Sequence, residues 1–410
     1  MSESQLEGSA SDIEYLLSTR AIRERAQKIF ELALEGKTHF EVNLTRLPEA
    51  AKLVTDVTRA NYPTLEIPFH SRWSHFQVGG VDRLAGLHAK LASMAREDQT
   101  KCLLDLVVVS VLLDAGSGPD WKFIENGRTF ARSEGLAVAS LHLFLEGAFS
   151  SDPNQPLQVD AEGLAKFSRP RLSKGFQVTA ENPLAGESGR YELLKSLGKA
   201  LSKKAEFFGF HPGRPGNLLD YLKSQAPGGK LKATQILTAL QRGLGSIWPG
   251  RVSVGSLNLG DVWPYAPLGA GLGGLVPFHK LSQWLTYSMI EPIMKSGLEV
   301  ILTTELTGLA EYRNGGLFLD AGVLALRDPA EATQIHAPGS ELIVEWRALT
   351  LVLLEKTALL VRENLDRNEE EFPLGKVLEG GTWWAGRKIA AQLRPGGGPP
   401  LQISSDGTVF

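Results

Sequence analysis

The segment 341–365 constrains the fold more than any other part of this 410-residue chain. After Glu345, Trp346 and Arg347 it is almost wholly apolar. A helix that is apolar on every side must be buried, so we expect the central helix here. A polar group near its start, such as Glu345, is expected to be buried or at the rim of a cavity. The alternative is that Glu345 is simply an acid of the first turn, where the helix dipole favours negative charge.

Periodic apolar residues predict many further helices, whereas strand signals are few. We therefore expect a mainly α-helical protein with a few short strands and no βαβ alternation. It forms either one large domain over residues 1–410 or two lobes, about 1–210 and 211–410, with the site between them. Residues 245–278, rich in glycine and proline, are expected to form an irregular binding loop. Helices are expected at 12–36, 48–61, 82–96, 99–114, 133–148, 189–208, 216–224, 233–244, 278–296 and 376–394, and a short hairpin turning at Asn126-Gly127.

The composition excludes several classes of protein. Apolar residues make up 43% and charged residues 22%, which is ordinary for a soluble globular chain. A net charge of −3 gives no basic bias, so we expect no nucleic-acid partner. No apolar run approaches about 18 residues and the N-terminus lacks the layout of a secretory signal, so we expect no membrane contact and a cytoplasmic location.

Metal and cofactor motifs are weak, and we expect neither a metal nor an organic cofactor. Of eight histidines only His70 and His75 are close in sequence, and no zinc-binding spacing occurs. The segment Gly269–Gly274 fits the glycine pattern of dinucleotide-binding folds. However, prolines precede it where that pattern needs a strand, so a flexible loop is favoured.

The segment 306–320 gathers polar side chains that could serve a catalytic site. It contains Glu311, Arg313, Asn314 and Asp320 between apolar residues. Asn314-Gly315 is a strong turn-forming pair, which predicts a turn between two apolar segments. Such a turn can hold polar groups beside a pocket, although a hairpin tip with solvated charges has the same pattern.

Three other segments combine charge with aromatic rings. Arg72 offers a bidentate grip on phosphate or carboxylate and Trp73 a flat surface; the alternative places Trp73 in the core and Arg72 in a salt bridge outside. Asp261, beside Trp263, is either solvent-facing, employed at a site or a helix cap. Arg387 follows two tryptophans and could close over an anion, or lie on the basic face of a helix.

Six segments scattered over nearly the whole chain carry a family resemblance: Ile67 to Trp73, Leu113 to Gly116, Gly118 to Trp121, Glu311 to Gly316, Glu345 to Thr350 and Ser405 to Phe410. Together they resemble the uracil catabolism protein 4 family, which carries domain of unknown function 1688. The resemblance implies a step of uracil breakdown in which urea is released from a ribosylurea intermediate.

A more distant likeness supplies a mechanism. Gly260 to Trp263, and Leu306-Thr307 followed by Ala310 to Arg313, are similar to segments of queuosine-phosphate N-glycosylases. Those enzymes are related to helix-hairpin-helix DNA glycosylases, which implies a helical, DNA-glycosylase-like architecture. The catalytic carboxylate of that family is an aspartate, and the matching position here is Glu311, which is one methylene longer.

The resemblances together imply an N-glycosidase-like hydrolase acting on a small molecule, ribosylurea or its 5′-phosphate. Glu311 would stabilise an oxocarbenium ion, as carboxylates do in glycoside hydrolysis. The alternatives are a metal-dependent amidohydrolase attacking a ureido compound, or a non-enzymatic binding or scaffold protein. Asp261, His70 or Asp320 could assist departure of urea or bind the ureido group. The other candidate substrate contacts are Arg72, Trp73, Trp263, Arg313, Asn314 and Arg387.

Overall fold

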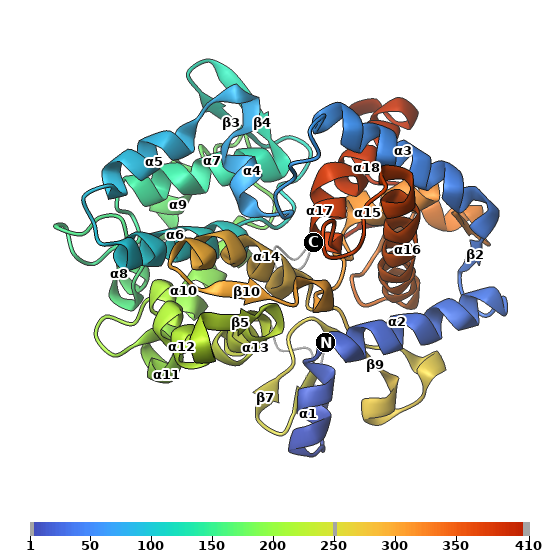
Figure 1. The fold of residues 1–410 in the computed structure, drawn as a ribbon, viewed down its shortest axis with the longest axis horizontal. Helices are drawn as coiled ribbons and strands as arrows, with labels where there is room; N and C mark the ends of the chain where they lie inside the picture. Colours follow the sequence, from blue (N-terminus) through green and yellow to red (C-terminus); the bar gives the residue numbers. More distant parts are fainter. Residues whose placement is uncertain (1–3, 249–251, 405–410) are drawn as a thin grey trace. The chain divides into compact units, whose positions relative to one another are not determined.

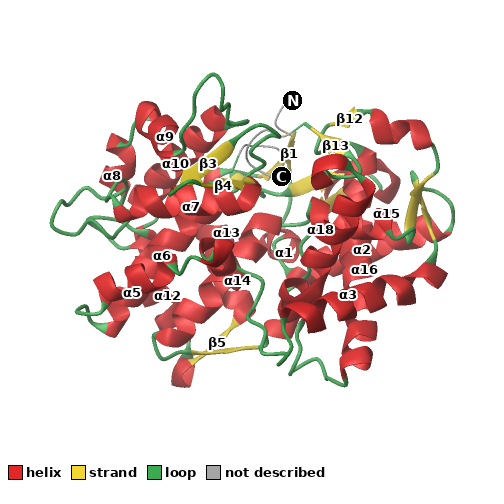
Figure 2. Cartoon of the chain, turned by 90° about the horizontal axis from the view of Figure 1, so that it is seen from above, coloured by secondary structure: helices red, strands yellow, loops and turns green. Residues whose placement is uncertain are grey.

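The computed structural model describes residues 4–248 and 252–404, and the expected mainly α-helical fold with short strands is confirmed (Figure 2). The described residues separate into two compact units. The first contains the chain up to His70, from Val252 to Gln283 and from Leu302 to Ser404. The second contains Ser71 to Trp248 and Trp284 to Ile301. Each unit thus uses chain from both sides of residue 210.

The central helix of the first unit is α16, Glu341–Leu365, as its apolar sequence predicted. It packs against α2, α3 and α15, and Figure 1 shows these helices together with α17 and α18. Glu345 lies in the second turn because the helix begins at Glu341, so the alternative of a first-turn acid was wrong. The helices of this unit are α1 (Ala10–Leu16), α2 (Thr19–Leu34), α3 (Leu47–Asn61), α15 (Tyr312–Asp320), α16, α17 (Leu374–Val377) and α18 (Trp383–Leu393), with the start of α14 (Lys280–Lys295).

The strands of the first unit are short and lie at its connections. β1 pairs with β6, β6 with β7, β8 with β9, β11 with β2, and β12 with β13. The predicted irregular segment 245–278 contains the β8–β9 pair, and Gly271–Gly274 within it forms a 3₁₀ turn. The bounds are β1 (Ser4–Leu6), β2 (Phe40–Val42), β6 (Val252–Val254), β7 (Leu257–Asn258), β8 (Val262–Pro264), β9 (Leu275–Pro277), β11 (Leu324–Leu326), β12 (Ile335–His336) and β13 (Gln402–Ile403).

The second unit is built around α6, Arg96–Leu112, which is buried along most of its length. The predicted hairpin at Asn126-Gly127 is confirmed as β3 and β4, and both turn residues have positive φ. The other helices are α4 (Arg72–Phe76), α5 (Arg83–Leu91), α7 (Arg132–Leu145), α8 (Ala161–Lys166), α9 (Arg169–Gly175), α10 (Glu187–Lys203), α11 (Ala205–Phe208), α12 (Leu218–Ser224), α13 (Ala233–Leu244) and the rest of α14. The strands are β3 (Lys122–Glu125), β4 (Arg128–Ala131), β5 (Lys230–Lys232) and β10 (Glu299–Ile301).

Three predicted helices are interrupted. Residues 189–208 contain most of α10 and all of α11, with Lys204 between the two helices. Residues 12–36 contain α1 and α2 with a break at Ser18, whose hydroxyl accepts a hydrogen bond from the first turn of α2. Residues 376–394 contain the end of α17, a π-helical segment over Leu378–Thr382 labelled η10, and α18. Within residues 4–248 and 252–404, none of the helices combines the length and hydropathy needed to span a membrane.

Candidate active site

Glu311 immediately precedes α15 in the first unit and caps the N-terminus of that helix. One carboxylate oxygen accepts the backbone N–H of Arg313 at 2.8 Å and the other that of Asn314 at 2.7 Å. The residue is 9% exposed. Its orientation is thus fixed, and a helix N-terminus is a favourable place for a negative charge. Each oxygen receives one of these hydrogen bonds and can accept another.

The residues after Glu311 are helical, so the predicted turn at Asn314-Gly315 was wrong. The glycines serve close packing here rather than a turn. A Cβ atom at Gly315 would lie 2.8 Å from side-chain atoms of both Trp346 and Thr350 on α16. The indole N–H of Trp346 also donates to the carbonyl oxygen of Gly315 at 3.1 Å. Local turn propensity is therefore overridden by the close approach of α15 to the central helix.

Asn314 joins α15 to the π-helical segment η10. It is fully buried, its Oδ1 accepts from the hydroxyl of Thr382 at 2.9 Å, and its Nδ2 donates to the carbonyl of Leu309 at 3.1 Å. Asn314 thus holds Glu311 through its backbone N–H, and its own side-chain hydrogen bonds hold Asn314 in place. α18, which follows η10, packs on α15, as Figure 1 shows.

The segment η10 also positions Glu379, which the sequence did not single out. The Nδ1–H of His70 donates to one carboxylate oxygen of Glu379 at 2.8 Å, and the Tyr62 hydroxyl donates to the other at 3.0 Å. Burial and the Glu379 carboxylate raise the pKa of Tyr62, which keeps the phenol a donor. The His70 ring centroid lies 6.2 Å from that of Trp383, the residue after Thr382. π-helical segments often occur at functional sites.

The remaining charged candidates of this region have different surroundings. Arg313 donates to the carbonyl of Gly397 at 2.8 Å and lies over the Tyr312 ring. Asp320, at the other end of α15, forms a bidentate ion pair with Arg394 at 2.7 and 2.6 Å. Arg387 is exposed on α18. Its guanidinium lies 5.5 and 5.6 Å from the ring centroids of Trp383 and Trp384.

Asp261 precedes β8 and is the acceptor in a dense cluster of hydrogen bonds. Arg347 donates to both carboxylate oxygens, at 2.8 and 2.7 Å. The indole of Trp263 adds a bond of 2.7 Å and the backbone N–H of Lys280 one of 3.0 Å. Burial alone would raise the pKa of Asp261, but these donors, Arg347 foremost, hold it below its ordinary value of 3.8. Its four acceptor positions are therefore all occupied.

Three consecutive residues of α16 anchor different parts of the first unit. Glu345 accepts from the Tyr265 hydroxyl at 2.8 Å and from the backbone N–H and Nδ1–H of His39 at 2.8 and 2.9 Å. Trp346 contacts α15 and Arg347 holds Asp261, as described above. Burial raises the pKa of Glu345. The central helix therefore contacts both α15 and the segment that contains Asp261.

Arg72 and Trp73 lie in the second unit, on α4. Arg72 is fully buried, so the expectation of a salt bridge outside the core was wrong. Its guanidinium bonds to the Ser110 hydroxyl at 2.7 Å and to Asp114. The indole of Trp73 donates to the carbonyl of Ser288 at 2.7 Å. Trp73 is buried, as the core interpretation predicted.

Comparisons with known proteins agree with the family resemblance. The family model described as "Protein of unknown function (DUF1688)" matches residues 15–410. The chain belongs to this family. "Protein urg3" of Schizosaccharomyces pombe is 43% identical over 412 residues, covering 98% of this chain and 100% of that protein. "Uracil catabolism protein 4" of Lachancea kluyveri is 38% identical over 437 residues, covering 97% and 99% respectively.

Two of the six segments that carry the family resemblance lie on α15 and α16 of this DUF1688 protein, and Leu113 to Gly116 and Gly118 to Trp121 lie in the second unit. Glu311 to Gly316 cap and begin α15, and Glu345 to Thr350 lie on α16. The terminal motif Ser405 to Phe410 lies outside the described residues. Among the described residues, no group of three or more histidine, cysteine, aspartate or glutamate side chains could hold a metal ion.

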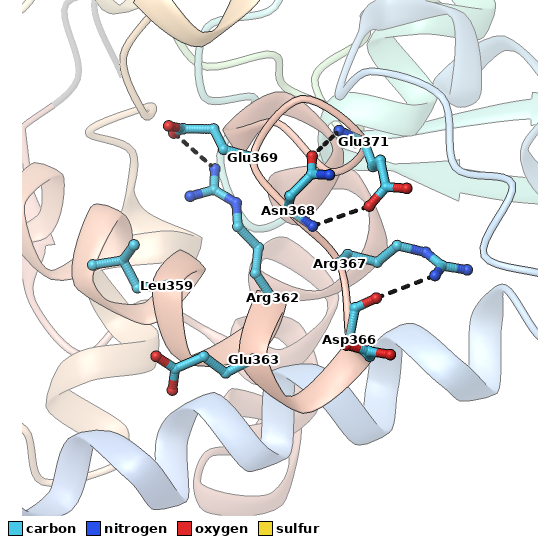
Figure 3. Close-up of a pocket in the computed structure, with 8 residues that line it drawn as sticks. All are labelled: Leu359, Arg362, Glu363, Asp366, Arg367, Asn368, Glu369 and Glu371. Atoms are coloured by element: carbon cyan, nitrogen blue, oxygen red, sulfur yellow. Dashed lines mark hydrogen bonds and ion pairs between the residues drawn. The ribbon is translucent and has the colours of Figure 1, made fainter.

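A pocket of about 520 Å³ lies at the C-terminal end of α16. None of the predicted site residues lines this pocket. Figure 3 shows its charged walls, in which Arg362 pairs with Glu369 at 3.2 Å, and Asn368 and Glu371 cap one another. Arg367 donates to the backbone carbonyl of Asp366 at 3.2 Å in the turn that follows the helix. Its lining residues are Leu359, Arg362, Glu363, Asp366, Arg367, Asn368, Glu369 and Glu371.

Proposed function

We propose that this protein is a hydrolase of uracil catabolism that releases urea from a ribosylurea, either free or as its 5′-phosphate. The name of the Lachancea kluyveri relative supports the pathway. The observation that carries the proposed chemistry is the geometry of Glu311. A largely buried carboxylate is held by two backbone N–H groups and retains an acceptor position on each oxygen.

Cleavage of the bond between urea nitrogen and the anomeric carbon develops positive charge on the sugar. A carboxylate on one face of the sugar can stabilise that oxocarbenium character or attack it, as in glycoside hydrolysis. Preorganisation matters because the group then needs no reorientation during the reaction. In our proposal Glu311 has this role, and Asn314 and Thr382 keep its helix in place.

Urea is a poor leaving group as an anion, so a proton donor is needed. The hydrogen bonds from Arg347 lower the pKa of Asp261, which makes it a poor proton donor. Both carboxylate oxygens of Asp320 accept hydrogen bonds from Arg394, so this side chain is already engaged. We therefore assign proton donation to His70, which in its doubly protonated form would pass the Nε2 proton to the departing urea nitrogen while Nδ1–H stays bonded to Glu379. A carboxylate on one ring nitrogen fixes the tautomer and orientation of an imidazole, and Glu379 has that position here.

The other candidates receive supporting roles. Asp261 would position Trp263 and Arg347, since its oxygens are already engaged. Arg387 is the cation best suited to a 5′-phosphate, because it is exposed and lies beside two aromatic rings. Arg313 is less suited because it is buried, with one guanidinium N–H donated to the carbonyl of Gly397.

The experiment is a urea assay with ribosylurea and with its 5′-phosphate. We expect urea from at least one compound, and no urea from either would overturn the proposal. Glu311→Gln should reduce the rate at least about 100-fold, as removal of a charge-stabilising group does. Glu311→Asp keeps the charge and should retain part of the activity.

The matched control is Asp160→Asn in the second unit. Asp160 is also a buried helix-capping carboxylate, which accepts the N–H of Gly163 at 2.8 Å at the start of α8. Both variants lose a charged cap, at a cost of about 1 kcal/mol in stability. Only Glu311→Gln should lose urea release. Equal activity in the two variants would remove Glu311 from the mechanism.

A further inference from the structure

Gln283 is a fully buried residue whose side-chain amide makes no hydrogen bond to any described residue. It lies in the first turn of α14, in the part of that helix that belongs to the first unit. Its exposed fraction is 0%, and neither Oε1 nor Nε2 has a partner. A buried amide without partners is unfavourable, and groups of this kind call for an explanation.

The surroundings of Gln283 are held rigidly. The backbone N–H of Lys280 donates to Asp261 at 3.0 Å, and that of Phe278 donates to the carbonyl of Asp261 at 2.9 Å. His279, with φ of 48°, donates from Nε2 to the carbonyl of Leu16 at 2.9 Å. The helix turn that carries the amide is therefore fixed to the Asp261 cluster before any ligand binds.

A primary amide offers a carbonyl acceptor and N–H donors in one plane. A ureido group offers the complementary N–H and C=O in one plane, so the two can form a pair of parallel hydrogen bonds. We propose that Gln283 recognises the ureido group of the substrate. This inference rests on the proposed function and deepens it, because it names the residue that distinguishes a urea leaving group from an apolar one.

The chain contains a comparison residue for this assignment. Gln241, on α13 of the second unit, is also buried, and both atoms of its amide lack a partner among the described residues. Leu237, Leu240 and Leu244 of the same helix are also buried. Gln241 therefore controls for burial of an unpaired amide.

The test is Gln283→Met beside Gln241→Met, measured by thermal unfolding without ligand and by urea release. Methionine has a similar shape and no hydrogen-bonding requirement, so both variants should unfold at or above the wild-type temperature. Gln283→Met should lower kcat/KM by about tenfold or more, the factor expected for one or two lost hydrogen bonds. Gln241→Met should leave kcat/KM unchanged.

Product inhibition adds a readout that a structural role would not change. Gln283→Met should weaken inhibition by urea, at concentrations that do not denature the protein, and leave inhibition by ribose unchanged. A lower unfolding temperature with unchanged kcat/KM would overturn the inference, because Gln283 would then serve stability alone. If the wild type releases no urea, the proposed function fails. If it releases urea and Gln283→Met does so equally well, only the Gln283 assignment fails.

Discussion

Replacing Arg347 with methionine should destabilise the first unit strongly. Arg347 is 1% exposed and supplies two of the four hydrogen bonds to the Asp261 carboxylate. The variant keeps an apolar side chain that can pack on Phe278, whose ring centroid lies 4.0 Å from the guanidinium. What it loses is the positive charge, and the Asp261 carboxylate then retains only the Trp263 and Lys280 donors.

The magnitude follows from the geometry. Two hydrogen bonds to charged groups contribute about 1.5–3 kcal/mol each, and removing one partner of a buried ion pair typically costs about 3–5 kcal/mol. We therefore expect the free energy of unfolding to fall by about 3–5 kcal/mol near neutral pH. The pair Asp320–Arg394 is the control. The Arg394 side chain is 28% exposed, so Arg394→Met should cost less because solvent screens that charge.

The pH dependence gives a second check on the cause. In the wild type the pKa of Asp261 lies below 3.8, so the pair stabilises the fold at all pH values above that and the effect is lost as pH falls through the folded pKa. Without Arg347, burial raises the pKa of Asp261 instead. The difference in stability between wild type and variant should therefore be largest near neutral pH. It should begin to decrease above pH 3.8, as pH falls through the raised pKa of Asp261 in the variant, and continue to decrease down to the lowered pKa of Asp261 in the wild type.

Guanidinium unfolding, followed by circular dichroism and tryptophan fluorescence at several pH values, measures these quantities. Urea is unsuitable as the denaturant because it is the proposed product. The double variant Asp261→Asn with Arg347→Met should recover part of the lost stability, since the unpaired charge is gone. A loss below about 1 kcal/mol, typical of an exposed pair, would refute the reasoning, as would a loss that does not change with pH.

Two further predictions concern packing and charge. Gly386→Ala should destabilise the protein by about 1–3 kcal/mol, because the new Cβ would lie 2.2 Å from the carbonyl oxygen of Arg313. Gly86 lies on α5 with open space around it, so Gly86→Ala should stabilise the protein by about 0.5–1 kcal/mol. Thermal unfolding compares the two variants, and a change of stability in the same direction in both would contradict the packing argument. Hydrogen bonds from Arg83 lower the pKa of Glu125 to about 2. The wild type should therefore be more stable than Glu125→Gln above pH 4.5, and this difference should vanish as pH falls towards about 2. A difference in stability that stays constant across that pH range would refute the prediction.

Much of the helical structure could be predicted because its signals are local. The apolar pattern of 341–365 identified the central helix, and Asn126-Gly127 identified the hairpin. The same turn chemistry failed at Asn314-Gly315. Because Gly315 has no side chain, Trp346 of α16 can approach it closely. A turn rule uses only the local sequence and contains no information about that neighbour.

The candidate site shows the same division. Glu311 could be singled out from its own segment, but its role as a helix cap depends on where α15 begins. The partner of Asp261 is Arg347, 86 residues later, and the partner of His70 is Glu379, 309 residues later. Pairings over such separations are set by tertiary packing, for which neither spacing nor composition gives a signal.

The most direct test of the proposed chemistry is to follow the fate of the ureido carbon. Ribosylurea, or its 5′-phosphate, labelled with ¹³C at the ureido carbonyl is incubated with the purified protein and followed by ¹³C NMR. Cleavage at the anomeric carbon predicts that all of the label appears in intact urea, and that Glu311→Gln abolishes this signal. Label in bicarbonate with release of ammonia would mean attack on the urea carbonyl and would contradict the account.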